Sequence, residues 1–108
     1  MLPDRLARLP VITLHEGATL HEARGFRNRL LGLAFLDEIP AGHALFIPDT
    51  RSIHTFGMRF ALDVAFLDER ARTLRIERGV PRRRVLVCRD AFAVVESRAG
   101  EIERFLVR

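Results

Sequence analysis

The chain has 108 residues, of which 48% are hydrophobic and 30% are charged. This composition excludes a disordered chain, and the length excludes a second domain of ordinary size, so we expect one folded domain over residues 1–108. The net charge is +4 and every basic residue is arginine. Such a surface suits an anionic partner, but it is also typical of GC-rich coding, so nucleic acid is not the first partner that we expect.

Cysteine usage and targeting signals narrow the class further. The single cysteine, Cys88, has no second cysteine for an internal disulfide, and the histidines show no spacing typical of metal ligands. We therefore expect no metal site and no cofactor. The N-terminal segment lacks an apolar run long enough for a signal peptide, and the chain has no uncharged apolar stretch long enough to cross a bilayer. These features predict a cytoplasmic protein without a transmembrane segment.

The first part of the chain predicts, in order, a hairpin, a helix and a buried strand. They cover residues 11–14 with 18–23, residues 26–36, and residues 43–47. Gly17 supplies the tight turn of the hairpin, and apolar residues recur at helical spacing in the second element. Pro40 follows the predicted end of the helix.

The segment HTFGMRFALDVAFLD, residues 54–68, has the most informative pattern in the chain. Its even positions from 56 to 66 are apolar, whereas its odd positions are mainly small, and this alternation predicts one long strand with a bend or bulge at Gly57. Arg59 and Asp63 are the charged residues on the odd face. Core and candidate site would therefore share one strand.

After Asp68 the chain turns back, and residues 72–77 predict a strand that pairs with residues 62–67. Beyond this hairpin the sequence predicts a break, a basic turn, two buried strands and a short helix; they cover residues 79–81, 82–84, 85–87, 92–95 and 100–108. Many short strands with one or two helices indicate a mostly β fold, either a jelly-roll-like sandwich or a partly open barrel.

Four stretches together resemble the DUF192 family, also called UPF0127: RLLGLAF at 29–35, ALFI at 44–47, SIHTFGMRFALDVAFLD at 52–68 and AVVESRAG at 93–100. The resemblance covers about residues 18–105. It implies a compact, jelly-roll-like β domain in a family without an established activity. It also marks recurrent positions, among them Arg29, Gly32, Asp63, Glu96 and Gly100.

Two interpretations of the polar residues stay open. In the first, a cleft for a small polar or anionic ligand is lined by His54, Thr55, Arg59 and Asp63. Arginine offers a bidentate fork to such a ligand, and the other side chains orient it. In the second, the groups are scaffold: Asp63 and Glu96 accept hydrogen bonds from Arg29 or from backbone amides, and thereby fix the helix, near Gly32, against the sheet.

Two further functions are weaker alternatives. A hydrolytic enzyme would use His54 as base and Asp63 as its orienting partner, but no serine or cysteine nucleophile stands at a recognisable elbow. Phosphate or nucleic-acid binding through Arg82–Arg84 would lack tryptophan and tyrosine for base stacking. We therefore predict a small binding or accessory module, not an enzyme, with its site between His54 and Asp63 and with a protein partner as a further interpretation.

Overall fold

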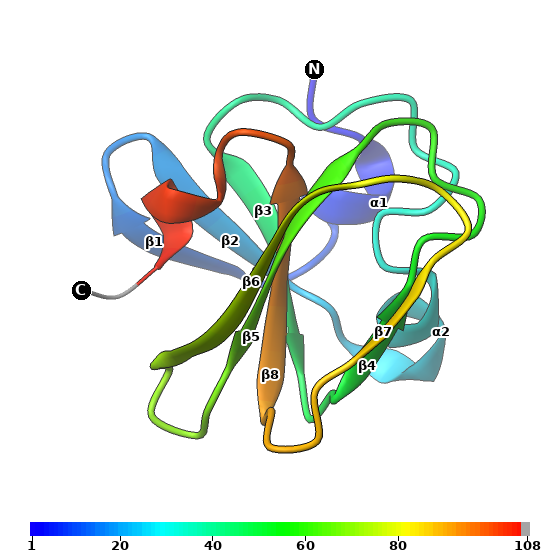
Figure 1. Cartoon of the computed structure of the whole chain (residues 1–108). Coiled ribbons are helices and arrows are strands. Elements are labelled where there is room, and N and C mark those ends of the chain that lie inside the picture. The colour runs from blue at the N-terminus through cyan, green and yellow to red at the C-terminus, as the bar shows by residue number, and fades with distance from the viewer. Residues whose placement is uncertain (107–108) are drawn as a thin grey trace.

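The computed structural model describes residues 1–106, which form one six-stranded sheet and one two-stranded ribbon (Figure 1). The strands are β1 (Val11–His15), β2 (Ala18–Glu22), β3 (His43–Pro48), β4 (Ser52–His54), β5 (Leu62–Leu67), β6 (Thr73–Val80), β7 (Val85–Val87) and β8 (Ala93–Arg98). The helices are α1 (Asp4–Ala7), α2 (Gly25–Leu31) and the 3-10 helix η1 (Ile102–Phe105). The prediction of a mostly β fold is confirmed.

The large sheet has the order β1-β2-β3-β8-β5-β6, and the ribbon consists of β4 and β7. β1 and β6 are the two edges of the large sheet and do not pair with each other, so the partly open alternative is the one that the chain adopts. β2 and β3 are parallel, and the connection between them contains α2. A parallel pair needs such a crossover, which carries the end of α2 over the middle of the sheet.

Both faces of the large sheet are covered, which explains the alternation in β5. Its side chains enter two separate clusters, Leu62, Val64 and Phe66 on one face and Ala65 and Leu67 on the other. β5 lies between β8 and β6, and η1 covers the second face. The expectation that the odd positions form a surface is therefore wrong for β5, because a second core lies there.

The prediction of one long strand over residues 54–68 is also wrong. β4 ends at His54 and β5 begins at Leu62, and the two strands belong to different sheets. Gly57 lies between them with a φ of +80°, a value that glycine adopts without strain. The alternation of apolar residues thus continues through a turn, where it does not indicate a strand.

Other boundaries differ in smaller ways. The two predicted hairpins are confirmed as β1–β2 and β5–β6. α2 ends at Leu31 instead of residue 36, because Gly32 has a φ of +55°. The predicted break at residues 79–81 falls at Pro81, since β6 continues to Val80, and β7 is a largely exposed strand instead of a buried one.

The helix α1 was not predicted from the sequence, and the predicted C-terminal helix over residues 100–108 corresponds to the shorter η1. Residues 107–108 of that prediction lie outside the described part of the chain. No helix within residues 1–106 is long and apolar enough to span a bilayer.

Candidate functional site

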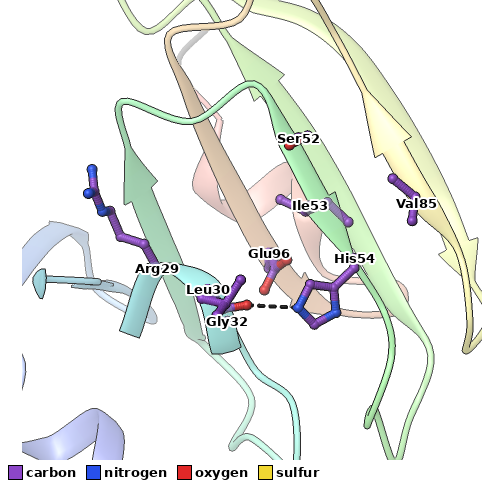
Figure 2. Close-up of a pocket in the computed structure, with 8 residues that line it drawn as sticks. All are labelled: Arg29, Leu30, Gly32, Ser52, Ile53, His54, Val85 and Glu96. Carbon is purple, nitrogen blue, oxygen red and sulfur yellow. Dashed lines mark hydrogen bonds between the residues drawn. The ribbon is translucent and has the colours of Figure 1, made fainter. Parts of the chain in front are cut away.

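The candidate site is a cavity of about 200 Å³ between α2 and β4, with Glu96 of β8 among its lining residues (Figure 2). The end of α2 and the residue after it contribute Arg29, Leu30 and Gly32, and β4 contributes Ser52, Ile53 and His54. A water molecule takes up roughly 30 Å³ of liquid, so the cavity has the volume of about seven waters. It suits a compact ligand.

Glu96 is a buried acid with incomplete hydrogen bonding. Its side chain is 2% exposed, and its Oε1 atom has no hydrogen-bond partner among the described residues. Burial raises the pKa of Glu96 to about 7, and a hydrogen bond from the backbone amide of Leu33 opposes this shift. Figure 2 shows the carboxyl group directed into the space between Gly32 and His54.

Gly32 allows this carboxyl group to lie against the end of α2. A Cβ atom at Gly32 would be only 2.7 Å from Glu96 Oε1, and the φ of +55° at this position also favours glycine. The glycine therefore serves both to end the helix and to admit the acid.

Two other buried side-chain atoms within residues 1–106 lack a hydrogen bond, Glu101 Oε2 and His21 Nδ1. Glu101 Oε2 still lies 2.7 Å from the guanidinium of Arg98. His21 is occupied on its other side by a 2.9 Å hydrogen bond to His43. Neither group lines the cavity, so Glu96 is the buried acid available to a ligand there.

Both ring nitrogens of His54 are hydrogen-bonded within the protein. Its Nε2 atom is 2.9 Å from the carbonyl oxygen of Leu30, and its Nδ1 atom accepts a 3.2 Å hydrogen bond from the backbone N–H of Phe56. A carbonyl only accepts and an amide only donates, so in this geometry Nε2 is the donor and Nδ1 is the acceptor. His54 therefore ties the end of α2 to β4, and neither ring nitrogen is left to act as a base.

α2 forms one wall of the cavity without burying any of its side chains. Arg5 holds the segment after the helix, because its Nη2 atom donates to the carbonyl oxygens of Gly32 at 2.9 Å and Ala34 at 2.7 Å. Burial and, to a smaller extent, the charge of Arg27 lower the pKa of Arg5 below its usual range. The wall thus depends on polar contacts from Arg5 and His54 more than on apolar packing.

Of the four predicted ligand-binding residues, only His54 lines this cavity. Thr55 is buried, and its hydroxyl donates to the carbonyl of Pro81 at 2.7 Å and accepts from the amide of Arg84 at 2.8 Å. It therefore anchors the basic turn. Arg59 instead forms an ion pair with Asp37 in solvent.

Asp63 lies on the opposite face of the sheet from the cavity. It is adjacent to Val64 and Leu62, which enter the first core cluster, so its own side chain points to the second. Its Oδ1 accepts from the amide of Gly79 at 2.9 Å, and its Oδ2 accepts from the amide of Gly100 at 2.8 Å. The structure therefore does not bring Asp63 together with His54.

The scaffold interpretation also paired Arg29 with the buried acids, and this pairing is absent. The Arg29 side chain points away from Glu96 (Figure 2), and it forms no ion pair with a carboxylate of residues 1–106. Within the same residues, no group of three or more histidine, cysteine or acidic side chains is placed to hold a metal ion.

The family model of DUF192, described as an uncharacterized ACR, matches residues 12–108. The chain belongs to the DUF192 family. Two positions that the sequence resemblance marked, Gly32 and Glu96, are in contact in this DUF192 chain and line its cavity together. The signal for Glu96 was present in the sequence, because it follows three apolar residues of a central strand.

Two crystal structures share the fold of this DUF192 chain. A candidate transcription regulator from Sinorhizobium meliloti 1021 has a TM-score of 0.71 and 19% identity, over 81% of this chain and 73% of that one. A protein of unknown function from Novosphingobium aromaticivorans DSM 12444 has a TM-score of 0.69 and 19% identity, over 87% and 74%. At this identity the likeness shows the fold alone. No curated protein matches the sequence.

Proposed function

We propose that this domain is a binding module for a small polar ligand, which occupies the cavity beside Glu96. The observation that carries the proposal is the buried Glu96 carboxyl group, whose Oε1 has no partner among the described residues although the group lines a cavity. An unpaired buried acceptor is costly, and a ligand that donates a hydrogen bond to it recovers that cost. The ligand therefore carries an amine or a hydroxyl group.

The other lining groups add to this selectivity. Ile53 and Val85 provide apolar surface, whereas Arg29 offers a guanidinium fork for an anionic group outside the cavity. His54 contributes to the shape of the cavity and not to hydrogen bonds with the ligand, because both of its ring nitrogens are already bonded within the protein. This arrangement favours recognition over hydrolysis, since Asp63 is not available to orient His54.

A thermal-shift screen tests the proposal with small amines, amino acids, polyols and sugars. The proteins are the wild type, Glu96→Gln, and Glu69→Gln as a control at an exposed acid. A compound at about 100 times its dissociation constant adds about 2.7 kcal/mol to stability, which raises the midpoint by several degrees. We expect one class of compound to stabilise the wild type and the control but not Glu96→Gln. Equal shifts in all three proteins would contradict the proposal.

A second candidate function is phosphate binding at Arg82–Arg84. All three arginines are exposed, and none pairs with an acid in the described part of the chain. The Sinorhizobium protein is described as a candidate transcription regulator, so an oligonucleotide is the phosphate ligand to test here. Replacement of the three arginines by alanine would abolish a salt-sensitive shift of a short oligonucleotide.

A further inference from the structure

The outer edge of β4 carries backbone groups that no strand of residues 1–106 pairs with. The amide of Cys88 donates to the carbonyl of Arg51 at 2.8 Å, and the amide of Thr55 donates to the carbonyl of Arg84 at 2.9 Å. Hydrogen-bonded and non-bonded pairs alternate along an antiparallel ladder, so the backbone groups of Ser52 and His54 must point away from β7. In Figure 2, α2 lies on the other side of β4 from Val85 of β7.

A second cavity extends the first along this edge. It has a volume of about 250 Å³ and is lined by residues of α2 and of the segment 49–52. Arg29, Leu30 and Ser52 line both cavities, so the two form one continuous groove between α2 and β4, which we call the edge groove. Phe26, which is 74% exposed, lines the second cavity and gives the edge groove an apolar wall.

The two ends of the edge groove differ in charge. The unpaired carboxyl group of Glu96 lies at the end near His54, whereas Arg51 lines the other end together with Asp49. Arg29 lies between them, and neither it nor Arg51 forms an ion pair within residues 1–106. With one acid against two arginines, the second cavity is positive, and it complements a carboxylate.

The length of this edge limits the length of a ligand that can pair with it. At roughly 3.3 Å per residue, the chain from Arg51 to His54 spans about 10 Å. An extended peptide of two or three residues has the same length. Its amides and carbonyls repeat at the spacing of the unpaired groups on β4, as in other cases of strand addition to a free sheet edge.

From these observations we infer that the ligand of the edge groove is a short peptide with free ends, which pairs with the outer edge of β4. Its amino group lies at Glu96 and its carboxylate lies at Arg51. The peptide therefore runs antiparallel to β4, with a side chain against Phe26. This inference rests on the proposed function, because it uses the same acid and narrows the ligand to one class.

The test is a titration of the ¹⁵N-labelled protein with trialanine, N-acetyl-trialanine, trialanine amide and ethylammonium, followed by NMR. We expect trialanine to shift the amide signals of Ser52 and His54, and blocking either of its ends to weaken binding by about tenfold, the effect of one lost charge-assisted contact. Glu96→Gln should remove the preference for a free amino end. Arg51→Ala should remove the preference for a free carboxylate, whereas Arg70→Ala, which changes the net charge equally at an exposed turn, should leave both preferences intact.

The outcomes separate the inference from the proposal on which it depends. If ethylammonium binds at Glu96 and trialanine binds no more tightly, the peptide inference is wrong and the small-ligand site remains. If the acetylated and free peptides bind equally, the inference is also wrong. If neither ethylammonium nor any peptide perturbs the groove residues, both the inference and the amine-binding form of the proposal fail.

Discussion

Asp63 and Glu96 are two buried acids on neighbouring strands, and they differ in how their oxygens are satisfied. Asp63 is 1% exposed and Glu96 is 2% exposed. Both oxygens of Asp63 accept backbone amides, those of Gly79 and Gly100. Glu96 leaves Oε1 without a partner among the described residues, beside a cavity. The two acids are therefore buried alike but differ in their hydrogen bonding.

The difference arises from the sheet itself. Val64 of β5 lies opposite Glu96 of β8, so Asp63, the neighbour of Val64, points to the other face. On that face the end of β6 at Gly79 and the turn at Gly100 present amides to Asp63. On the face of Glu96, the end of α2 approaches without filling the space next to β4. An acid enclosed by amides supports the fold, whereas an acid beside a cavity is available for recognition.

The largest expected effect is at Asp63. Asp63→Ala removes two partly buried hydrogen bonds from backbone amides to a charged acceptor, and we expect a loss of about 3 to 5 kcal/mol in the free energy of unfolding, measured by urea denaturation. Asp68→Ala is the matched control, because Asp68 also accepts two backbone amides, from Arg70 and Arg72, but in an exposed turn. A loss at Asp63 no larger than that at Asp68 would contradict the structural role.

We expect Glu96 to make the stability of the wild type depend on pH, and we expect Glu96→Gln to remove this dependence. The folded pKa of about 7 lies above the ordinary value of 4.5, so the folded chain holds the proton more tightly than the unfolded chain. Wild type should therefore lose about 3 kcal/mol relative to Glu96→Gln as the pH rises from 4.5 to 7, and little more above that. Urea denaturation of both proteins across this range measures the difference. Parallel stability curves would show that Glu96 is not a desolvated acid.

Gly32→Ala tests the contact between Glu96 and the residue that follows α2. The new Cβ atom would lie 2.7 Å from Glu96 Oε1, in a residue that also has a positive φ. We expect a loss of about 2 kcal/mol or more. Gly25→Ala is the control, because Gly25 has a φ of +81° but no atom within 4 Å of the new Cβ position. Thermal or urea unfolding of both variants would reveal the contact with Glu96 as the difference between them.

The smallest effect should come from Arg59, the charged group that is most prominent in the sequence pattern. Its side chain is 54% exposed and that of its partner Asp37 is 84% exposed. Arg59→Ala should therefore cost less than about 1 kcal/mol and leave ligand shifts at Glu96 unchanged. A larger loss of stability, or a loss of ligand binding, would contradict this prediction and indicate that Arg59 belongs to the site.

Local patterns predicted the elements whose partners are near in sequence. The turn at Gly17 and the polar interruption after Asp68 indicated the two hairpins, because a short turn fixes which strands pair. The extent of β4 and β5 did not follow from local pattern. Apolar side chains at residues 56, 58 and 60 continue the alternation through a turn, where packing and not strand geometry places them.

The sequence places Thr55, Arg59 and Asp63 beside His54 in the candidate site, whereas the structure places other residues next to His54. Sequence spacing placed Arg59 and Asp63 beside it, because a single strand was assumed. The actual neighbours are Leu30 and Glu96, which α2 and β8 bring to His54 from distant parts of the chain. Such a meeting depends on the order of strands in the sheet, which short-range periodicity does not encode.

The bonds from Arg5 to the segment after α2 have a practical consequence for the choice of a domain boundary. The family match begins at residue 12, whereas α1 and Arg5 precede it. A fragment designed from the match alone would keep the whole cavity lining and all of the strand residues except Val11 at the start of β1. It would nevertheless lose the guanidinium that bonds to the carbonyls of Gly32 and Ala34. A well-folded fragment of this kind could fail in a ligand screen for a reason unrelated to the ligand.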